Sequence, residues 1–166
     1  MKVVRKLLAP LLVVGILLTS LISLHQLKAD KKKDVFRIGI SQFITHQSLD
    51  ATREGFVDEL AKQGYVEGEN IEIDLQNAQG EQRNLKTISQ QLAESSDVVL
   101  AIATPSAQSL ANTTQTTPVV FSAVTDPVSA KLVESKEHPG GNVTGTSDQS
   151  SDAISTQINL IKKVLP

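Results

Sequence analysis

The chain contains 166 residues, of which 40% are hydrophobic and 20% are charged, and its formal net charge is −2. This composition is ordinary for a globular protein of about one domain, and it gives no sign of a nucleic-acid-binding surface or a disordered tail. Cysteine is absent, which excludes disulfides, thiolate catalysis and cysteine-based zinc sites, and the three histidines, His25, His46 and His138, are too scattered to form a spaced metal motif.

An apolar stretch at residues 7–24 follows the basic residues Lys2, Arg5 and Lys6. It is about long enough to cross a bilayer, it is longer than a cleaved signal peptide usually needs, and no small-residue cleavage site follows it. An uncleaved membrane anchor is therefore favoured over a cleaved signal peptide, with residues 25–34 as a polar linker. The positive-inside bias leaves the orientation open, because Lys28 and the lysines at 31–33 on the far flank compete with the amino-terminal positive residues. We expect the rest of the chain to lie outside the cytoplasm, either anchored to the cell membrane or secreted.

The folded domain is predicted to begin with a strand at residues 35–41, a turn at 42–48 and an amphipathic helix at 49–64. Apolar and polar residues then alternate at 71–76, which is typical of a half-exposed strand near the margin of a sheet. A second helix is predicted at 82–95.

A continuous apolar run at residues 98–103 predicts a central strand that is buried on both faces. Thr104 is placed as a helix N-cap and Pro105 as the first helical residue, so that a tight turn leads into a helix ending near residue 113. Such a turn points free backbone N–H groups outward, and we expect it to contact a small anion or carboxylate at residues 104–107.

The remaining elements are a strand at 119–124, a turn at 125–127, a short strand at 142–146 and a helix at 152–164. Strands and helices alternate along the whole domain, which predicts an α/β fold with a parallel, Rossmann-like sheet. We expect the strand order 2-1-3-4-5.

In that order the carboxyl ends of the first, third, fourth and fifth strands meet at one edge of the sheet. The polar residues that follow these strands are mostly hydroxyl and amide groups, which suit hydrogen bonding to a small polar molecule better than they suit bond-making. They are Ser41, Gln42, His46, Thr104, Ser106, Ser122, Thr125, Asp126, Thr146 and Ser147. We predict a binding cleft at this edge.

A catalytic alternative uses Ser106, His46 and Asp126 as nucleophile, base and orienting residue. The segment around Ser106 lacks the glycines of a nucleophile elbow, and serine is common early in helices for capping reasons. His46 is as compatible with a solvated turn as with a ligand contact, and Asp126 is typical of a turn. We therefore predict that the chain is not an enzyme and that it uses no cofactor or metal.

Five segments together resemble the ABC-transporter substrate-binding proteins of the tryptophan/aromatic amino-acid uptake type. They are IGISQFITH (38–46), DATREGF (50–56), AIATPSAQ (101–108), AVTDPV (123–128) and PGGNVTGTSD (139–148). The resemblance spans residues 35–166.

The resemblance implies one lobe of a type I periplasmic-binding-protein-like fold, in which two lobes close on a solute and deliver it to an ABC permease and its ATPase subunits. It implies that the solute is an amino acid, with tryptophan or another aromatic residue as candidates. The implied ligand-binding residues are Gln42, Phe43, His46, Thr104, Ser106, Ala107, Thr125, Asp126, Thr146, Ser147 and Asp148.

Two features depart from the family pattern. The sequence stops at Pro166, close to where a family member's chain enters its second lobe, so we assign residues 1–34 to the leader and linker and residues 35–166 to the amino-terminal lobe, with the second lobe absent. A lipid-attachment cysteine is also missing, so retention at the membrane would depend on residues 7–24. The alternative function is a membrane-tethered ligand-sensing domain on the same fold.

Overall fold

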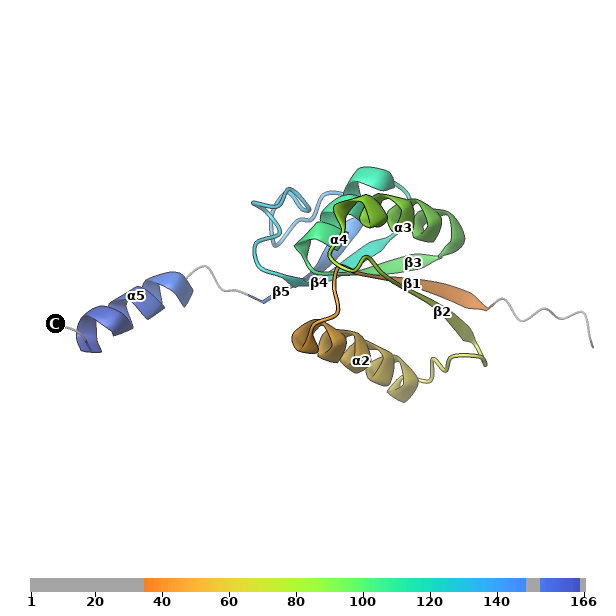
Figure 1. The fold of residues 1–166 in the computed structure, drawn as a ribbon, viewed down its shortest axis with the longest axis horizontal. Helices are drawn as coiled ribbons and strands as arrows, with labels where there is room; N and C mark the ends of the chain where they lie inside the picture. Colours follow the sequence, from red (N-terminus) through yellow and green to blue (C-terminus); the bar gives the residue numbers. More distant parts are fainter. Residues whose placement is uncertain (1–34, 149–152, 165–166) are drawn as a thin grey trace, which may run out of the picture. The chain divides into compact units, whose positions relative to one another are not determined.

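The computed structural model describes residues 35–148 and 153–164. Five parallel strands form one sheet in the order β2-β1-β3-β4-β5 (Figure 1). The strands are β1 (Phe36–Gln42), β2 (Ile71–Asn77), β3 (Val98–Ile102), β4 (Val119–Val124) and β5 (Val143–Ser147). The predicted α/β class and strand order are therefore confirmed.

Helices cover both faces of this sheet. The first helix, α2 (Gln47–Lys62), lies on one face, and α3 (Gln82–Ser95) and α4 (Thr104–Thr113) lie together on the other (Figure 1). A further helix, α5 (Ala153–Val164), forms where the sequence predicts the last helix. Each helix begins and ends within two residues of its predicted bounds.

The central strand β3 divides the apolar core into two clusters. Val99 and Ala101 are buried in the cluster beneath α3 and α4, while Leu100 and Ile102 are buried in the cluster that faces α2. Full burial of each larger side chain stabilises the fold by about 1.5–3 kcal/mol. Burial of β3 on both faces agrees with its continuous apolar run.

The two helical layers contribute differently to these clusters. Leu85, Ile88 and Leu92 of α3 are buried, as their spacing predicts. The apolar stripe of α2 packs against the sheet as predicted, but none of its residues is fully buried. The α2 layer is therefore the more exposed of the two.

Strand β2 lies at the margin of the sheet, as its alternating pattern predicts. Ile71 is buried, whereas Leu75 is 47% exposed near the end of the strand. Glu72 and Asp74 point to the opposite face of the strand and are exposed. Only one face of β2 is thus partly covered.

The start of α4 differs from the prediction. Ala103, rather than Thr104, is the N-cap, and Pro105 follows Thr104 in the first helical turn. Ala103 has a φ of 79°, which ends β3 one residue early, and it has no side-chain acceptor to cap the helix. The assignment of Thr104 as N-cap was wrong because the left-handed backbone at Ala103 starts the helix one residue sooner.

No helix within residues 35–148 and 153–164 is long and apolar enough to cross a membrane. The predicted anchor at residues 7–24 lies outside these residues, so it stays a prediction. The same holds for the linker at 25–34.

Gly145 provides a stability test, because it pairs with Phe121 across β4 and β5 at very close approach. A Cβ at this position would lie 2.1 Å from the Phe121 carbonyl oxygen, so Gly145→Ala should destabilise the fold by about 1–3 kcal/mol or more. The matched control is Gly55→Ala on α2, where a Cβ meets nothing within 4 Å, and it should stabilise by about 0.5–1 kcal/mol. Urea unfolding of the chain measures both, and equal midpoints for the two variants would contradict this packing.

Candidate functional site

The carboxyl ends of β1, β3, β4 and β5 lie along one edge of the parallel sheet (Figure 1). We call this the carboxyl edge and define it by residues 42–50, 103–107, 122–129 and 146–148. All the ligand-binding residues predicted from sequence lie within it. In open α/β sheets, ligands bind at such an edge.

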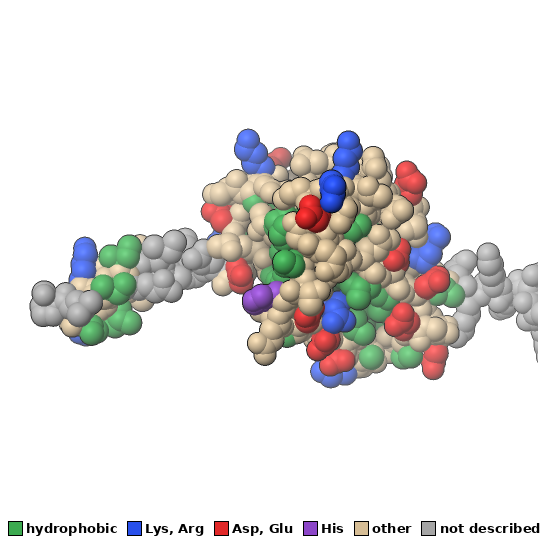
Figure 2. Space-filling model, viewed as in Figure 1, with side chains coloured by type: hydrophobic (Ala, Val, Ile, Leu, Met, Phe, Trp, Pro, Cys, Tyr) green, Lys and Arg blue, Asp and Glu red, His purple; other side chains and the backbone are tan. Residues whose placement is uncertain are grey.

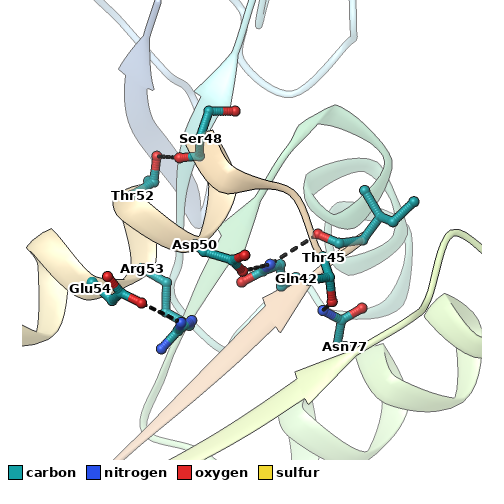
Figure 3. Close-up of polar contacts among 9 residues, drawn as sticks. Gln42, Thr45, Ser48, Asp50, Thr52, Arg53, Glu54 and Asn77 are labelled. Atoms are coloured by element: carbon teal, nitrogen blue, oxygen red, sulfur yellow. Dashed lines mark hydrogen bonds and ion pairs between the residues drawn. The ribbon is translucent and has the colours of Figure 1, made fainter.

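The buried side chain of Gln42 holds the turn after β1 through hydrogen bonds. This side chain is 1% exposed, and its Nε2 donates hydrogen bonds to the Ile44 carbonyl oxygen at 2.9 Å and to Asp50 Oδ1 at 2.8 Å (Figure 3). The amide nitrogen of Gln42 is therefore already used within the protein. Direct contact between Gln42 and a ligand stays a prediction.

The end of β2 and the turn between β2 and α3 also form hydrogen bonds to the turn after β1. The Gly80 N–H donates to the Phe43 carbonyl oxygen at 2.8 Å, and Asn77 Nδ2 donates to Thr45 Oγ1 at 3.2 Å (Figure 3). Phe43 itself is half-buried against the core cluster under α3 and α4. The 43–46 turn is thus tied to two elements while Thr45 and His46 remain exposed.

His46 is the N-cap of α2. Its Nδ1 accepts a hydrogen bond from the Ser48 N–H at 3.3 Å and lies 2.9 Å from Ser48 Oγ. Capping in this way satisfies one of the free N–H groups at the helix start. The ring is exposed, so the capping role leaves a face of His46 open at the carboxyl edge.

The junction of β3 and α4 contains free backbone donors. The Ala103 N–H donates to the Ser122 carbonyl oxygen at 3.0 Å, and the Ala103 carbonyl oxygen accepts from the Ala107 N–H at 3.1 Å. Among the described residues, no acceptor binds the N–H of Thr104 or of Ser106. Thr104 is half-buried and lies at the positive end of the helix.

Two residues of this junction lie below the surface. Ser106 and Ala107 are 0% exposed, and Ala107 belongs to the core. The Oγ atoms of Ser106 and of Ser41, at the end of β1, are buried without a hydrogen-bond partner in the described part of the protein. A buried hydroxyl without a partner lowers the stability of the fold by about 1–3 kcal/mol, and such groups are rare in native proteins. Both hydroxyls lie at or next to the carboxyl edge.

Hydrogen bonds also join the ends of β4 and β5. Ser147 Oγ donates to the Thr125 carbonyl oxygen at 2.9 Å, and the Asp148 N–H donates to the Val124 carbonyl oxygen at 3.2 Å. Thr125, Thr146, Ser147 and Asp148 are all exposed. These predicted site residues therefore lie side by side on the surface.

Asp126 organises its own turn. Its Oδ2 accepts from Ser129 Oγ at 2.6 Å, and its Oδ1 accepts from the N–H groups of Val128 and Ser129, each at 3.1 Å. The hydrogen bond from the Ser129 hydroxyl, and then the one from the Ser129 N–H, hold the pKa of the Asp126 carboxyl below its ordinary value of 3.8. Asp126 is thus a turn former that stays ionised at neutral pH.

The three residues of the catalytic alternative are engaged separately. His46 Nδ1 bonds with Ser48, the carboxylate of Asp126 bonds with its own turn, and Ser106 Oγ is buried with no partner among the described residues. A nucleophile with its base and orienting residue would be joined by hydrogen bonds. The structure does not bring these three side chains into that arrangement.

Sequence reasoning missed two residues of this edge and one residue beside it. Asp50 supports Gln42, Asn77 holds Thr45, and Ile44 is 41% exposed on the turn. Asp50 could have been predicted, because the first turn of a helix stabilises an acidic residue through its free N–H groups and partial positive charge. Asn77 and Ile44 could not, because their contacts depend on tertiary structure.

The described residues contain no group of three or more His, Cys, Asp or Glu side chains that could hold a metal ion. On the face shown in Figure 2, acidic and basic side chains are interspersed, with small hydrophobic areas between them. The polar hydroxyl and amide groups of the carboxyl edge, together with the carboxylates of Asp50, Asp126 and Asp148 and the start of α4, can bind a small polar molecule through hydrogen bonds and charge.

Comparison with protein families gives a match over residues 37–166 to the family described as ABC transporter substrate binding protein. A tyrosine-binding protein of Clostridioides difficile is 46% identical over 140 residues, which are 84% of this chain and 40% of that protein. The chain therefore spans well under half the length of this relative.

Two solved structures share the fold at high identity. A conserved domain protein from Vibrio cholerae has a TM-score of 0.73 and 47% identity, with coverage of 80% of this chain and 44% of that one. An ABC domain from Streptococcus pneumoniae in complex with L-Trp has a TM-score of 0.71 and 43% identity, with coverage of 77% and 43%. Both matches again correspond to less than half of the relative.

The hydrogen bonds of Asp126 give a prediction for pH dependence. Because its folded-state pKa is lowered, Asp126 stabilises the turn above the ordinary value of 3.8, and this contribution is lost as pH falls through the folded-state pKa. Ser129→Ala removes the strongest of these bonds, so the pKa of Asp126 should rise toward 3.8. NMR titration of the Asp126 side-chain carboxyl carbon measures it.

Ser135→Ala is the control for this titration, because Ser135 Oγ accepts from the His138 N–H and makes no hydrogen bond to Asp126. Its Asp126 titration should match that of the unaltered chain. An unchanged midpoint in Ser129→Ala would show that the hydroxyl does not set this pKa.

Proposed function

Because the chain belongs to the ABC transporter substrate-binding protein family, we propose that residues 35–166 form one lobe of a solute-binding protein and that the carboxyl edge is one wall of its binding site. The solute is held by hydrogen bonds and charge, without a covalent step. A second lobe closes over it, and closure excludes water from the solute.

One observation carries this proposal: at the start of α4 the Thr104 N–H has no acceptor among the described residues, and it shares the carboxyl edge with the exposed carboxylate of Asp148. The Thr104 N–H favours an anionic group, since the helix start carries a partial positive charge. Asp148 is exposed at the end of β5 and favours a cation. A zwitterion with a carboxylate and an ammonium group, as in a free amino acid, complements this pair.

An aromatic amino acid is the proposed ligand class. The similar proteins described above include a tyrosine-binding protein and a domain in complex with L-Trp. Ile44, 41% exposed on the 43–46 turn, supplies apolar surface at the same edge. Apolar lining with a few placed polar groups is the usual makeup of small-molecule sites.

The proposed transport role follows from family membership. The loaded protein would deliver its solute to an ABC permease driven by ATPase subunits, from a position outside the cytoplasm. Residues 7–24 would direct export or tether the protein to the membrane. The site has no role for a bond-forming side chain, so the proposed protein is a carrier rather than an enzyme.

A hybrid protein tests the function. Replacing the matching segment of the tyrosine-binding relative with this sequence should give a chain that binds tyrosine or tryptophan in the micromolar range. Residues 35–166 alone should bind about a thousandfold more weakly, because losing one wall of the site forfeits about 4 kcal/mol of the binding free energy. Calorimetry with tyrosine, tryptophan and leucine compares the two proteins.

The unaltered relative is the positive control for this experiment. A hybrid that folds but binds no amino acid, next to a relative that does, would contradict the proposed function. Micromolar binding by residues 35–166 alone would instead contradict the two-wall site.

Asp148→Asn in the hybrid tests the ammonium contact. The substitution removes the charge, so tyrosine should bind about tenfold more weakly, which corresponds to about 1.4 kcal/mol. The analogue of tyrosine that lacks the ammonium group should bind both proteins equally. Glu137→Gln removes an exposed charge from the loop before β5 and should leave the affinity for tyrosine unchanged.

A further inference from the structure

We infer that Asp50 and Gln42 are positioning residues that fix the 43–46 turn in the conformation that the binding edge needs. The inference rests on the proposed function, and it assigns to Asp50 and to the side-chain amide nitrogen of Gln42 the role of holding the turn in place. We use the name Gln42 bridge for the side-chain amide of Gln42 together with its two acceptors, the Ile44 carbonyl oxygen and Asp50 Oδ1.

The Gln42 bridge has only one good orientation. Both acceptors are oxygens and both bind Nε2, so a flipped amide would place Gln42 Oε1 against two oxygens. The side chain is 1% exposed, so water cannot easily replace a lost partner. The amide therefore joins strand, turn and helix in a single geometry (Figure 3).

Asp50 is the charged end of this bridge. It lies in the first turn of α2, where the helix start stabilises a carboxylate, and its own N–H donates to the His46 carbonyl oxygen at 2.9 Å. The nearby guanidinium of Arg53 bonds with Glu54 at 3.0 Å instead (Figure 3). Asp50 thus spans the turn twice, through its backbone to His46 and through its carboxylate to Gln42.

The turn held in this way presents side chains outward. Hydrogen bonds engage the carbonyl oxygens of Phe43, Ile44 and His46 from inside the protein. The side chains of Ile44, Thr45 and His46 are exposed at the carboxyl edge. A turn fixed before the solute arrives loses less conformational entropy on binding, which raises affinity.

The first test measures order in the turn without any ligand, by amide hydrogen exchange on the full chain. In Asp50→Ala, exchange at the Asp50-position N–H and at the Gly80 N–H should become at least tenfold faster, because these donors bond to the carbonyls of His46 and Phe43. Asp50→Asn keeps an acceptor oxygen for Gln42 and should restore most of the protection.

Thr117→Val is the matched control, because it removes a part-buried hydrogen bond from Thr117 Oγ1 to the Ala93 carbonyl oxygen, far from the turn in sequence and in the sheet. It should leave exchange at Gly80 unchanged. Unchanged exchange at Gly80 in Asp50→Ala, or equal acceleration in Asp50→Asn and Asp50→Ala, would overturn the inference.

The second test measures affinity in the hybrid protein under conditions where every variant is folded. Asp50→Ala should weaken tyrosine binding at least tenfold, Asp50→Asn should stay within about threefold of the unaltered hybrid, and Thr117→Val should stay within twofold. A purely structural role for Asp50 would lower stability in Asp50→Ala and leave the affinity of the folded protein unchanged, which would overturn the inference.

The two tests separate the inference from the proposed function. If the unaltered hybrid binds no amino acid, the proposed function fails, and hydrogen exchange still decides whether Asp50 orders the turn. If the hybrid binds tyrosine and the Asp50→Ala hybrid binds it equally well, the function stands and the positioning role fails.

Discussion

Side chains along β3 alternate between two apolar clusters, and this alternation imposes the layered architecture. Val99 and Ala101 pack beneath α3 and α4, while Leu100 and Ile102 face α2, so both faces of the sheet need a helical cover. Helices that connect parallel strands provide that cover, and each one returns the chain to the amino ends of the strands. The carboxyl ends of the strands therefore lie at one edge.

Hydrogen bonds at that edge run between neighbouring turns and strand ends as well as within single turns. The β2–α3 turn holds the turn after β1, the end of β3 bonds to Ser122 of β4, and the end of β5 bonds to Thr125. Neighbouring segments of the edge thus supply some of each other's hydrogen-bond partners. These hydrogen bonds hold a surface made of loops in one conformation, and binding of a small molecule requires such fixed geometry.

The sequence predicted the elements well because their signals are local. The spacing of Leu85, Ile88 and Leu92 indicates the buried face of α3, and the alternation after Ile71 indicates an edge strand. The left-handed backbone of Ala103 was not predictable, because a residue other than glycine rarely adopts a positive φ and no local pattern marks this alanine for it.

The candidate site was predicted at the level of its turns and less well at the level of side chains. Capping preferences place a serine such as Ser106 near the surface, whereas the packing of α4 buries it. The hydrogen bond between Gln42 and Asp50 joins the end of β1 to the first turn of α2. Hydrophobic periodicity in the sequence does not predict such a side-chain contact. Tertiary contacts therefore decide which predicted residues stay accessible.

The marginal strand β2 has a consequence for how copies of the protein behave together. Its outer backbone edge is unpaired among the named strands, and such an edge can recruit a strand from another molecule. Glu72 and Asp74 project from the exposed face of β2, so pairing of two such edges would bring four carboxylates together. Like-charge repulsion thus opposes edge-to-edge aggregation of this protein.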